Sequence, residues 1–305
     1  MALHGTRGEK IGGIRLRLTD IGYVKKLMAE HGIKFRKEFG QNFLINPAVP
    51  ERIAAECGAG AEDAVLEIGP GIGTMTQYLC ENYKKVVAVE IDRALIPVLR
   101  ETLADYDNVT VLCADIMKTD LHALFAEHFA GMHVTVCANL PYYITTPILM
   151  LLLESRLPID NITVMIQKEV AERLVAPAGS PEYGAVTAAV QYYAHVERLF
   201  SVSAGSFLPA PKVDSAVIRM ELYRTPPVSC KSETLLFRVI RAAFNQRRKT
   251  LPNALSAGLG DFTREEILSA LRAAGFSETV RGERLSTADF AHLADALLAE
   301  AEKDS

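Results

Sequence analysis

Short apolar runs alternate with stretches of helical spacing through the first two thirds of the chain. The apolar runs contain few polar positions and cover residues 64–68, 85–90, 109–113, 134–138 and 162–166. Segments whose apolar positions recur every three or four residues separate these runs, at 74–82, 93–104, 121–129 and 147–154. Because continuously apolar strands joined by helices must be covered on both faces, the pattern predicts an α/β fold built on a parallel sheet.

The pattern changes after the fifth apolar run. Helices are predicted at 167–176 and 185–193, and two strand-like runs follow at 196–202 and 215–222. Only a proline-containing loop, Phe207–Pro211, separates these last two runs. Strands without a helix between them favour antiparallel pairing, so we expect an antiparallel pair to close one edge of the sheet.

A linker rich in proline and polar residues, Tyr223–Ser229, precedes a C-terminal segment that has no strand pattern. Helical spacing recurs there at 233–248, 264–274 and 288–302, which predicts a small all-helical domain. The predicted boundaries are an N-terminal extension at 1–19 with no assigned role, an α/β domain at 20–223 and the helical domain at 224–305. The α/β domain is expected to begin with two helices, at 20–34 and 47–57.

Composition excludes several classes of protein. The chain has 305 residues, of which 49% are hydrophobic and 23% charged, so it is neither disordered nor fibrous. No apolar stretch approaches the ~18 residues of a membrane span, and the N-terminus lacks an apolar leader, so we expect a cytoplasmic location. The five cysteines form no C-x-x-C pair and are expected to be buried, reduced thiols. The seven histidines show no metal-ligand spacing, and we predict no metal site.

Charge is unevenly distributed along the chain. The net charge is −4, yet residues 1–40 carry nine basic and four acidic residues, and residues 231–250 carry six and one. The remainder carries 18 basic and 32 acidic residues. Two basic segments on an acidic body favour a polyanionic partner held at particular places, although charge alone also fits merely solvated faces.

The first strand leads into a glycine-rich turn. Gly69, Gly71 and Gly73 alternate with other residues, and a predicted helix begins directly afterwards. Such glycines let the backbone turn tightly and approach a ligand closely, and the helix start offers free N–H groups. The spacing is G-x-G-x-G rather than the G-x-G-x-x-G of a dinucleotide fold, which weakens a nicotinamide interpretation without excluding it.

Acidic residues follow the next two strands, at the sheet edge where ligands of such folds bind. Glu90 ends the second strand, and a carboxylate there can accept hydrogen bonds from both ribose hydroxyls, as it does in enzymes that bind nicotinamide dinucleotides. Asp115 follows the third strand and can accept a hydrogen bond from an adenine amino group. A helix cap is the alternative role for Asp115.

The fourth strand ends in Asn139-Leu140-Pro141-Tyr142, the most specific signal in the chain. Asn139 supplies a neutral acceptor oxygen, Pro141 fixes the turn, and Tyr142 presents an aromatic face at the mouth of the expected site.

Together these segments resemble the bacterial small-subunit ribosomal RNA adenine N6,N6-dimethyltransferases, and the matching pieces extend from about residue 20 to the last helices. Besides the glycine-rich turn, Glu90, Asp115 and the Asn139 motif, the matching segments are Phe39–Leu44, Gln167–Arg173, Tyr183-Gly184, Pro209–Ser215 and Phe244–Leu251. The resemblance implies a Rossmann-like S-adenosylmethionine-dependent methyltransferase sheet at 20–223 and an RNA-binding helical domain at 224–305. Met75 and Asn46 depart from the family's usual Leu and Asp.

The resemblance also implies residue roles. Asn42 and Leu44 are expected to lie over the methionine end of S-adenosylmethionine, with Gly69 and Gly71 beneath it. Glu90 is expected to bind the ribose and Asp115 the adenine amine of the cofactor. Asn139 is expected to lie between the cofactor and the substrate. Expected contacts to the substrate adenine come from Asn139, the Leu140 carbonyl, Tyr142 and Phe207, with a core role as the alternative for Phe207. Expected phosphate contacts are Arg241, Arg247, Arg248 and Lys249.

The expected activity is dimethylation of two adjacent adenosines in a hairpin loop near the 3′ end of small-subunit ribosomal RNA, with a role in small-subunit biogenesis. The expected partner is that RNA or an assembling small subunit, bound by a monomer, without membrane or metal. Two alternatives stay open: a large-subunit RNA methyltransferase of the antibiotic-resistance type, and an assembly factor whose activity is dispensable. The segment Phe244–Leu251 and the context of Tyr183-Gly184 count against the former.

Overall fold

The computed structural model describes residues 10–11, 14–15, 18–33 and 41–303. Within these ranges the chain forms two compact units. One contains the described residues up to Ala171 together with Glu197–Leu222, and the other contains Glu172–Val196 together with the residues from Tyr223 onward. The second unit thus includes the segment Glu172–Val196, which the sequence-based boundary at residues 223 and 224 assigns to the α/β domain.

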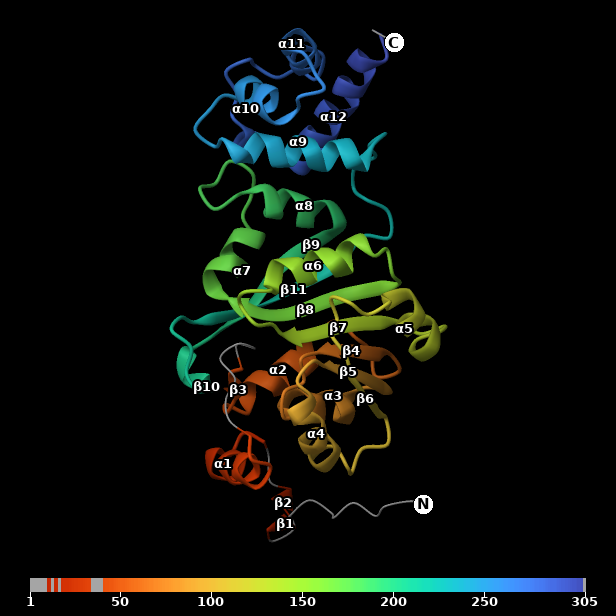
Figure 1. Cartoon of the computed structure of the whole chain (residues 1–305), viewed down its shortest axis with the longest axis vertical. Helices are drawn as coiled ribbons and strands as arrows, with labels where there is room; N and C mark the ends of the chain where they lie inside the picture. Colours follow the sequence, from red (N-terminus) through yellow and green to blue (C-terminus); the bar gives the residue numbers. More distant parts are fainter. Residues whose placement is uncertain (1–9, 12–13, 16–17, 34–40, 304–305) are drawn as a thin grey trace. The chain divides into compact units, whose positions relative to one another are not determined.

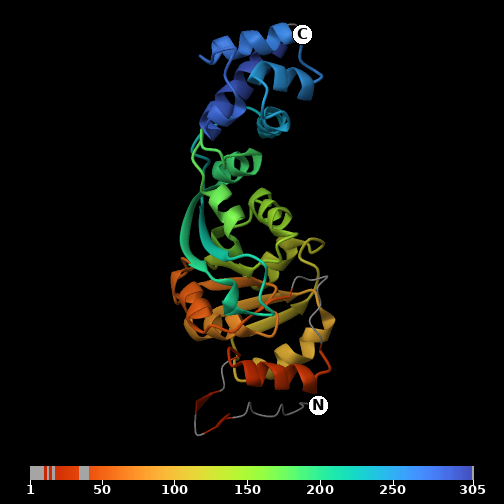
Figure 2. The ribbon, with the colours of Figure 1, turned by 90° about the vertical axis from the view of Figure 1, so that its left-hand side faces the viewer.

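A seven-stranded sheet forms the centre of the first unit, in the order β6-β5-β4-β7-β8-β11-β9 (Figure 1). Its strands are β4 (Ala64–Ile68), β5 (Lys85–Glu90), β6 (Val109–Cys113), β7 (Val134–Asn139), β8 (Ile159–Gln167), β9 (Ala194–Val202) and β11 (Ser215–Leu222). The five strands from β6 to β8 pair in parallel, and β11 pairs antiparallel with β8. The long strands β9 and β11 run side by side at one edge, as Figure 2 shows.

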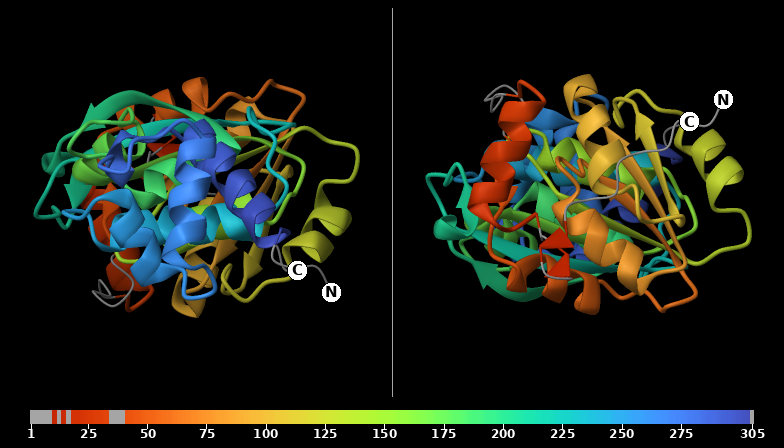
Figure 3. Two further views of the ribbon diagram at one scale, coloured as in Figure 1. Left: turned by 90° about the horizontal axis from the view of Figure 1, so that it is seen from above. Right: turned by 90° about the horizontal axis from the view of Figure 1, so that it is seen from below.

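Helices lie on both sides of this sheet (Figure 3). They are α2 (Ala48–Glu56), α3 (Thr74–Asn82), α4 (Ile96–Thr102), α5 (Leu121–His128) and α6 (Thr145–Glu154), and α1 (Ile21–Glu30) precedes them. Because crossover connections are right-handed and the strand order reverses at β4, α3 and α4 cover one face, and α5 and α6 cover the other. The predicted α/β sheet with its antiparallel edge strands is confirmed.

The core explains why these segments form these elements. Alternate side chains of the central strands, including Val65, Val86 and Cys137, pack against α2 and α3 in one buried cluster. A second cluster joins α1 to the loop before α3, with Leu27 against Phe43 and Ile72. Burial of these apolar side chains on one face of each helix is the main stabilising contribution to such a layered fold.

Two short strand pairs escape prediction because each strand is only two residues long. β3 (Phe43–Leu44) pairs antiparallel with β10 (Phe207–Leu208), and β1 (Lys10–Ile11) pairs with β2 (Ile14–Arg15). The pairing of β3 with β10 matters most, because it fixes Phe207 opposite Leu44.

The second unit is helical apart from the first residues of β9. It contains the end of α7 (Lys168–Leu174), α8 (Ala185–Tyr193), α9 (Glu233–Asn245), α10 (Leu251–Gly258), α11 (Arg264–Ala273), the short turn η4 (Gly282–Arg284) and α12 (Thr287–Ala301). Another short turn, η3 (Ala204–Ser206), belongs to the first unit. Ser232 caps α9, and Thr263 with Glu266 forms a capping box at the start of α11. The predicted helical C-terminal region is confirmed.

Several sequence-based expectations need correction. The C-terminal region has one helix more than predicted, α10, whose Pro252 occupies its second position, where proline is tolerated. The helix predicted at 93–104 begins as a 3₁₀ turn, η2 (Arg93–Leu95), so Pro97 falls near the start of α4. The expectation that all cysteines are buried is wrong for Cys113, which is exposed because it ends the edge strand β6, and for Cys230, which is only half-buried. Lys34, Arg36 and Lys37, which belong to the basic N-terminal segment 1–40, lie outside the described residues.

No helix in the described ranges is long and apolar enough to cross a bilayer. The same part of the chain contains no group of three or more His, Cys, Asp or Glu side chains arranged to hold a metal ion.

Candidate active site

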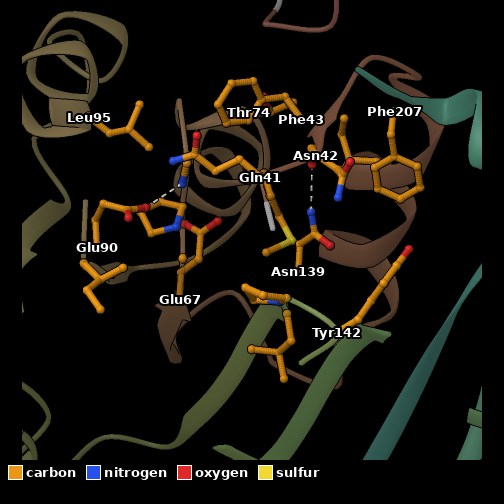
Figure 4. Close-up of a pocket in the computed structure, with 18 residues that line it drawn as sticks. Gln41, Asn42, Phe43, Glu67, Thr74, Glu90, Leu95, Asn139, Tyr142 and Phe207 are labelled. Atoms are coloured by element: carbon orange, nitrogen blue, oxygen red, sulfur yellow. Dashed lines mark hydrogen bonds between the residues drawn. The ribbon is translucent and has the colours of Figure 1, made fainter. Parts of the chain in front are cut away.

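A cavity opens at the carboxyl ends of β4, β5 and β7 (Figure 4). In the strand order, β4 has β5 on one side and β7 on the other, so this edge is the point at which the chain reverses direction across the sheet. Ligands of open α/β sheets bind at such switch points. All the residues that line the cavity belong to the first unit: Gln41–Leu44, Glu67, Gly69–Gly71, Thr74, Met75, Glu90, Ile91, Leu95, Asn139–Tyr142 and Phe207.

The glycine-rich turn after β4 forms one wall of the cavity. Gly69 has a φ of +70°, and a Cβ atom there would meet no atom within 4 Å, so its backbone faces open space. Gly71 has a φ of +62°, and a Cβ atom there would lie 3.2 Å from the Phe43 ring. Side chains at these positions would strain the backbone and fill the space that a ligand needs, so the turn is shaped for close contact with a bound molecule.

Glu90 lies opposite this turn at the end of β5. Its Oε2 accepts a hydrogen bond from the Gly71 N–H at 3.0 Å, and its Oε1 accepts one from the Asp92 N–H at 2.8 Å. Burial raises the pKa of the Glu90 carboxyl, while these two backbone hydrogen bonds oppose that shift. Each oxygen keeps a further lone pair, so the fixed carboxylate is suited to accept hydrogen bonds from a vicinal diol such as a ribose.

Glu67 is a second carboxyl group in the cavity wall, and the sequence analysis assigned it no role. It is fully buried in β4, and neither of its oxygens has a hydrogen-bond partner among the described residues. Burial raises the pKa of Glu67 to about 8; the nearby Thr76 hydroxyl opposes this shift, and the charge of Glu90 adds a little to it. A positively charged group in the cavity would favour the ionised form of this buried carboxyl, so Glu67 can pair with a cationic ligand group by giving up its proton.

These observations fit the cofactor that the resemblance implies. S-adenosylmethionine carries a sulfonium and an ammonium group beside a ribose. The cavity offers an unpartnered carboxyl at Glu67, a fixed acceptor at Glu90 and an open backbone wall at Gly69.

Asn139 ends β7 at the centre of the cavity, as Figure 4 shows. Its Nδ2 group donates a hydrogen bond to the Asn42 carbonyl oxygen at 3.3 Å. This contact orients the amide, because the nitrogen is committed to Asn42 and the oxygen is left to accept hydrogen bonds from another group. The neighbouring Leu140 N–H donates to the Met165 carbonyl at 3.1 Å, which ties the turn to β8.

Two aromatic side chains lie beside Asn139 (Figure 4). Tyr142 is half-buried, and its hydroxyl makes a hydrogen bond of 2.9 Å with the Ser215 hydroxyl at the start of β11. Phe207 reaches the cavity from β10 and also packs in the cluster around α2 and α3. Phe207 therefore has the core contact considered for it and also lines the cavity, while its contact with an adenine stays a prediction.

Asp115 is the one predicted cofactor residue that does not line the cavity. Its Oδ1 accepts a hydrogen bond from the Met117 N–H at 3.0 Å, and its Oδ2 lies 3.5 Å from Lys118 Nζ. The Ala114 N–H donates to the Glu90 carbonyl, so Asp115 follows the strand end that adjoins Glu90. A contact between Asp115 and an adenine stays a prediction.

The predicted phosphate contacts lie in the second unit, at and beyond the end of α9. Arg241, Arg248 and Lys249 are exposed. Arg247 is exposed as well, but its guanidinium donates hydrogen bonds to the carbonyl oxygens of Pro181 and Tyr183, the latter at 3.0 Å. Arg247 thus joins the end of α9 to the loop before α8. Arg241 donates only within its own helix, from Nε to the Phe237 carbonyl at 3.2 Å, among the contacts of the described residues.

Sequence reasoning missed Glu67, Gln41 and Phe43 as parts of the cavity. A signal for Glu67 was present, because a single carboxyl in an otherwise apolar five-residue strand calls for a specific partner. Gln41 donates to Asp92 Oδ2 at 3.0 Å, a contact between segments 51 residues apart that no local pattern reveals.

Comparisons with known proteins agree with this geometry. Residues 32–297 match the model of the family described as ribosomal RNA adenine dimethylase. A protein named ribosomal RNA small subunit methyltransferase A, from Lachnoclostridium phytofermentans, is 53% identical over 263 residues, which cover 86% of this chain and 91% of that protein. A protein of the same name from Geobacillus thermodenitrificans is 48% identical over 91% of this chain and 96% of its own length.

Solved structures give the same fold. A dimethyladenosine transferase from Plasmodium falciparum superposes with a TM-score of 0.72 at 27% identity, covering 86% of this chain and 98% of that one. The 23S rRNA methyltransferase ErmE superposes with a TM-score of 0.66 at 25% identity, covering 84% and 99%.

Proposed function

Because the chain belongs to the ribosomal RNA adenine dimethylase family, we propose that it dimethylates the N6 amino groups of two adjacent adenosines in small-subunit ribosomal RNA. The proposed target is a hairpin loop near the 3′ end of that RNA, and the proposed methyl donor is S-adenosylmethionine. The small-subunit assignment is supported by the names of relatives that are 48% to 53% identical over most of this chain.

The observation that carries the proposal is the orientation of Asn139. Its nitrogen donates to the Asn42 carbonyl, so its Oδ1 is available to accept a hydrogen bond from an amino group in the cavity. The Leu140 carbonyl is the second acceptor in the proposal. An exocyclic amine with two hydrogens is the substrate group that such a pair of acceptors matches.

This pair addresses the chemical difficulty of the reaction. The N6 amine of adenine is a poor nucleophile, because its lone pair is delocalised into the ring. Two acceptors that bind both amine hydrogens favour a pyramidal nitrogen, whose lone pair then points at the methyl group. S-adenosylmethionine, when bound, supplies a methyl group on a sulfonium, a reactive donor. Positioning of the amine by Asn139 and Leu140 therefore provides most of the rate enhancement. The surplus proton leaves the nitrogen after methyl transfer, so no strong base is needed.

The aromatic residues account for recognition of the base. An adenine must leave its stack to enter the cavity, and the proposal has Tyr142 stacking on one face and Phe207 covering the other. Two methyl groups per base require a site that accepts a monomethylated amine. In this proposal Arg241, Arg248 and Lys249 contact phosphates, and the protein acts as a cytoplasmic monomer on the RNA or on an assembling subunit.

The test is transfer of labelled methyl groups from S-adenosylmethionine to small-subunit particles that lack the modification. Large-subunit RNA is the substrate control, and Asn139→Ala is the enzyme control, with its folding checked by circular dichroism. We expect label approaching four methyl groups per small particle with the wild type, and none with large-subunit RNA or with Asn139→Ala.

Other outcomes identify the alternatives. Label in large-subunit RNA alone would assign the chain to the resistance-type enzymes, which the 25% identity to ErmE does not favour over the small-subunit relatives. Tight binding to small particles without any label would indicate an assembly factor. Turnover of Asn139→Ala near the wild-type rate would refute the role of Asn139.

A further inference from the structure

Two large hydrophobic side chains that are exposed, Ile91 and Tyr143, lie at the cavity or directly beside its lining. The described residues contain four such side chains: Ile21, Ile91, Tyr143 and Val213, with Tyr143 the most exposed at 64%. Ile91 lines the cavity, and Tyr143 directly follows the lining residue Tyr142. An exposed aromatic ring beside a binding site is a common mark of ligand contact rather than of packing.

Val213 lies near Tyr143 at the mouth of the cavity, on an edge that we call the rim and that includes Tyr142, Tyr143, Val213 and Ser215. The hydrogen bond of 2.9 Å between Tyr142 and Ser215 holds the turn after β7 against the start of β11, and Val213 precedes Ser215 by two residues. The strand register brings the same edges together, since Ser215 pairs with Gln167 and Asn139 pairs with Met165. Two exposed apolar side chains therefore flank one fixed contact at the mouth.

Two lysines and two acidic residues also lie at this edge of the cavity. Lys212 adjoins Val213, and the Lys168 N–H donates to the Asp214 carbonyl at 3.0 Å, so both lysines lie at this edge of the sheet and are exposed. The acidic residues nearby are Asp214, whose carboxylate accepts a hydrogen bond from the Ala204 N–H at 3.0 Å, and the exposed Glu169. An aromatic ring interleaved with lysines is the chemistry that binds single-stranded RNA.

We propose that Tyr143 is a stacking platform for the base of the nucleotide that adjoins the adenosine in the cavity. The inference rests on the proposed function, because extrusion of one adenosine leaves its neighbour without a stacking partner on that side. Tyr143 follows Tyr142 in the chain, so consecutive aromatic rings face consecutive bases. Val213 borders the platform, and Lys168 and Lys212 neutralise the phosphates between the two nucleotides.

The proposal explains how the second adenosine can be held near the cavity while the first occupies it. Two adjacent adenosines must each enter the same cavity, and the one that waits outside must be held close to it. Base–aromatic stacking tolerates any base, so one platform suits either adenosine whichever is methylated first.

Steady-state kinetics on unmodified small-subunit particles test the proposal with Tyr143→Ala and Tyr143→Phe. We expect Tyr143→Ala to raise KM for the particles by about 5- to 150-fold, the range for loss of one base–aromatic stack, with unchanged affinity for S-adenosylmethionine. Tyr143→Phe keeps the ring and is expected to retain a KM near the wild-type value. His133→Ala is the control for loss of an exposed ring away from the cavity, because His133 precedes β7 at the end opposite Asn139, where its only side-chain contact in the described residues is with Asp160 at 2.9 Å.

A second measurement reads stacking directly. An RNA hairpin with 2-aminopurine beside the target adenosine should lose fluorescence on binding the wild type and Tyr143→Phe, and lose less on binding Tyr143→Ala. Equal KM values for wild type and Tyr143→Ala, or equal damage by Tyr143→Phe and Tyr143→Ala, would overturn the platform. A change only in the sedimentation of the free protein would overturn it too, and would indicate self-association through Tyr143. Failure of the proposed function is distinct, because the wild type itself would then transfer no label.

Discussion

Removing the hydrogen bond between Tyr142 and Ser215 tests whether the orientation of the Tyr142 ring contributes to binding of the substrate base. Ser215 is almost fully buried at the start of β11, whereas Tyr142 is half-buried at the mouth of the cavity. The bond joins two hydroxyl oxygens at 2.9 Å and restrains the tilt of the Tyr142 ring. Ser215→Ala and Tyr142→Phe each remove one hydroxyl and leave the apolar shape almost unchanged, so either change frees the ring without removing it.

The magnitude follows from the kind of bond. A hydrogen bond between two neutral groups contributes about 0.5 to 1.5 kcal/mol, which corresponds to a factor of about 2 to 12 in kcat/KM if the ring orientation is used in the transition state. Because both variants lose the same bond, the double variant should be no worse than the poorer single variant. The coupling energy of the cycle should therefore equal about the whole effect of one substitution.

The assay is methyl transfer at subsaturating concentrations of small-subunit particles, measured for the wild type, both single variants and the double variant. Thermal unfolding serves as the folding control. Effects that multiply in the double variant would show that the two hydroxyls act independently. Wild-type kcat/KM in Ser215→Ala would show that ring orientation does not depend on this bond, and either result would refute the reasoning.

Three further predictions concern charges. Arg248→Ala with Lys249→Ala should weaken RNA binding and reduce the slope of log affinity against log salt by up to about 2, as filter binding over a salt series would measure; an unchanged slope would remove these residues from the interface. Arg247→Ala should instead lower Tm by a few degrees, because its bonds to Pro181 and Tyr183 join α9 to the neighbouring loop; an unchanged Tm in calorimetry would contradict that role. Glu67 has a pKa raised from 4.5 to about 8, so the folded protein holds a proton that the unfolded chain releases between these values. The free energy of unfolding of the cofactor-free protein should therefore fall between pH 4.5 and 8, by up to about 5 kcal/mol, and Glu67→Gln should lack this component in urea unfolding at pH 5 and pH 8; the same pH dependence in both proteins would contradict it.

The sheet was predictable because its strands are continuously apolar and its helices carry clear caps or apolar stripes. The predicted strands at β4, β5, β6 and β11 match the structure residue for residue. Most cavity residues were also predictable, because a parallel sheet gathers the residues that follow its strands at one edge.

The remaining features depend on contacts between distant segments. β3 and β10 form only because the chain brings Phe43–Leu44 against Phe207–Leu208, and two residues carry no periodic signal. The helix α10 was missed because it is short and begins with Leu251-Pro252. The tie from Arg247 to the loop before α8 has the same origin, since a basic run in the sequence does not show which guanidinium is already bound to the protein.

Nucleoside analysis detects the proposed product, N6,N6-dimethyladenosine in small-subunit RNA, without relying on a label. Unmodified small-subunit particles would be incubated with S-adenosylmethionine and the enzyme, and their RNA digested to nucleosides for mass spectrometry. We expect close to two N6,N6-dimethyladenosines per particle with the wild type and none with Asn139→Ala. Only singly methylated adenosine, or a methyl group on any other nucleoside, would contradict this expectation.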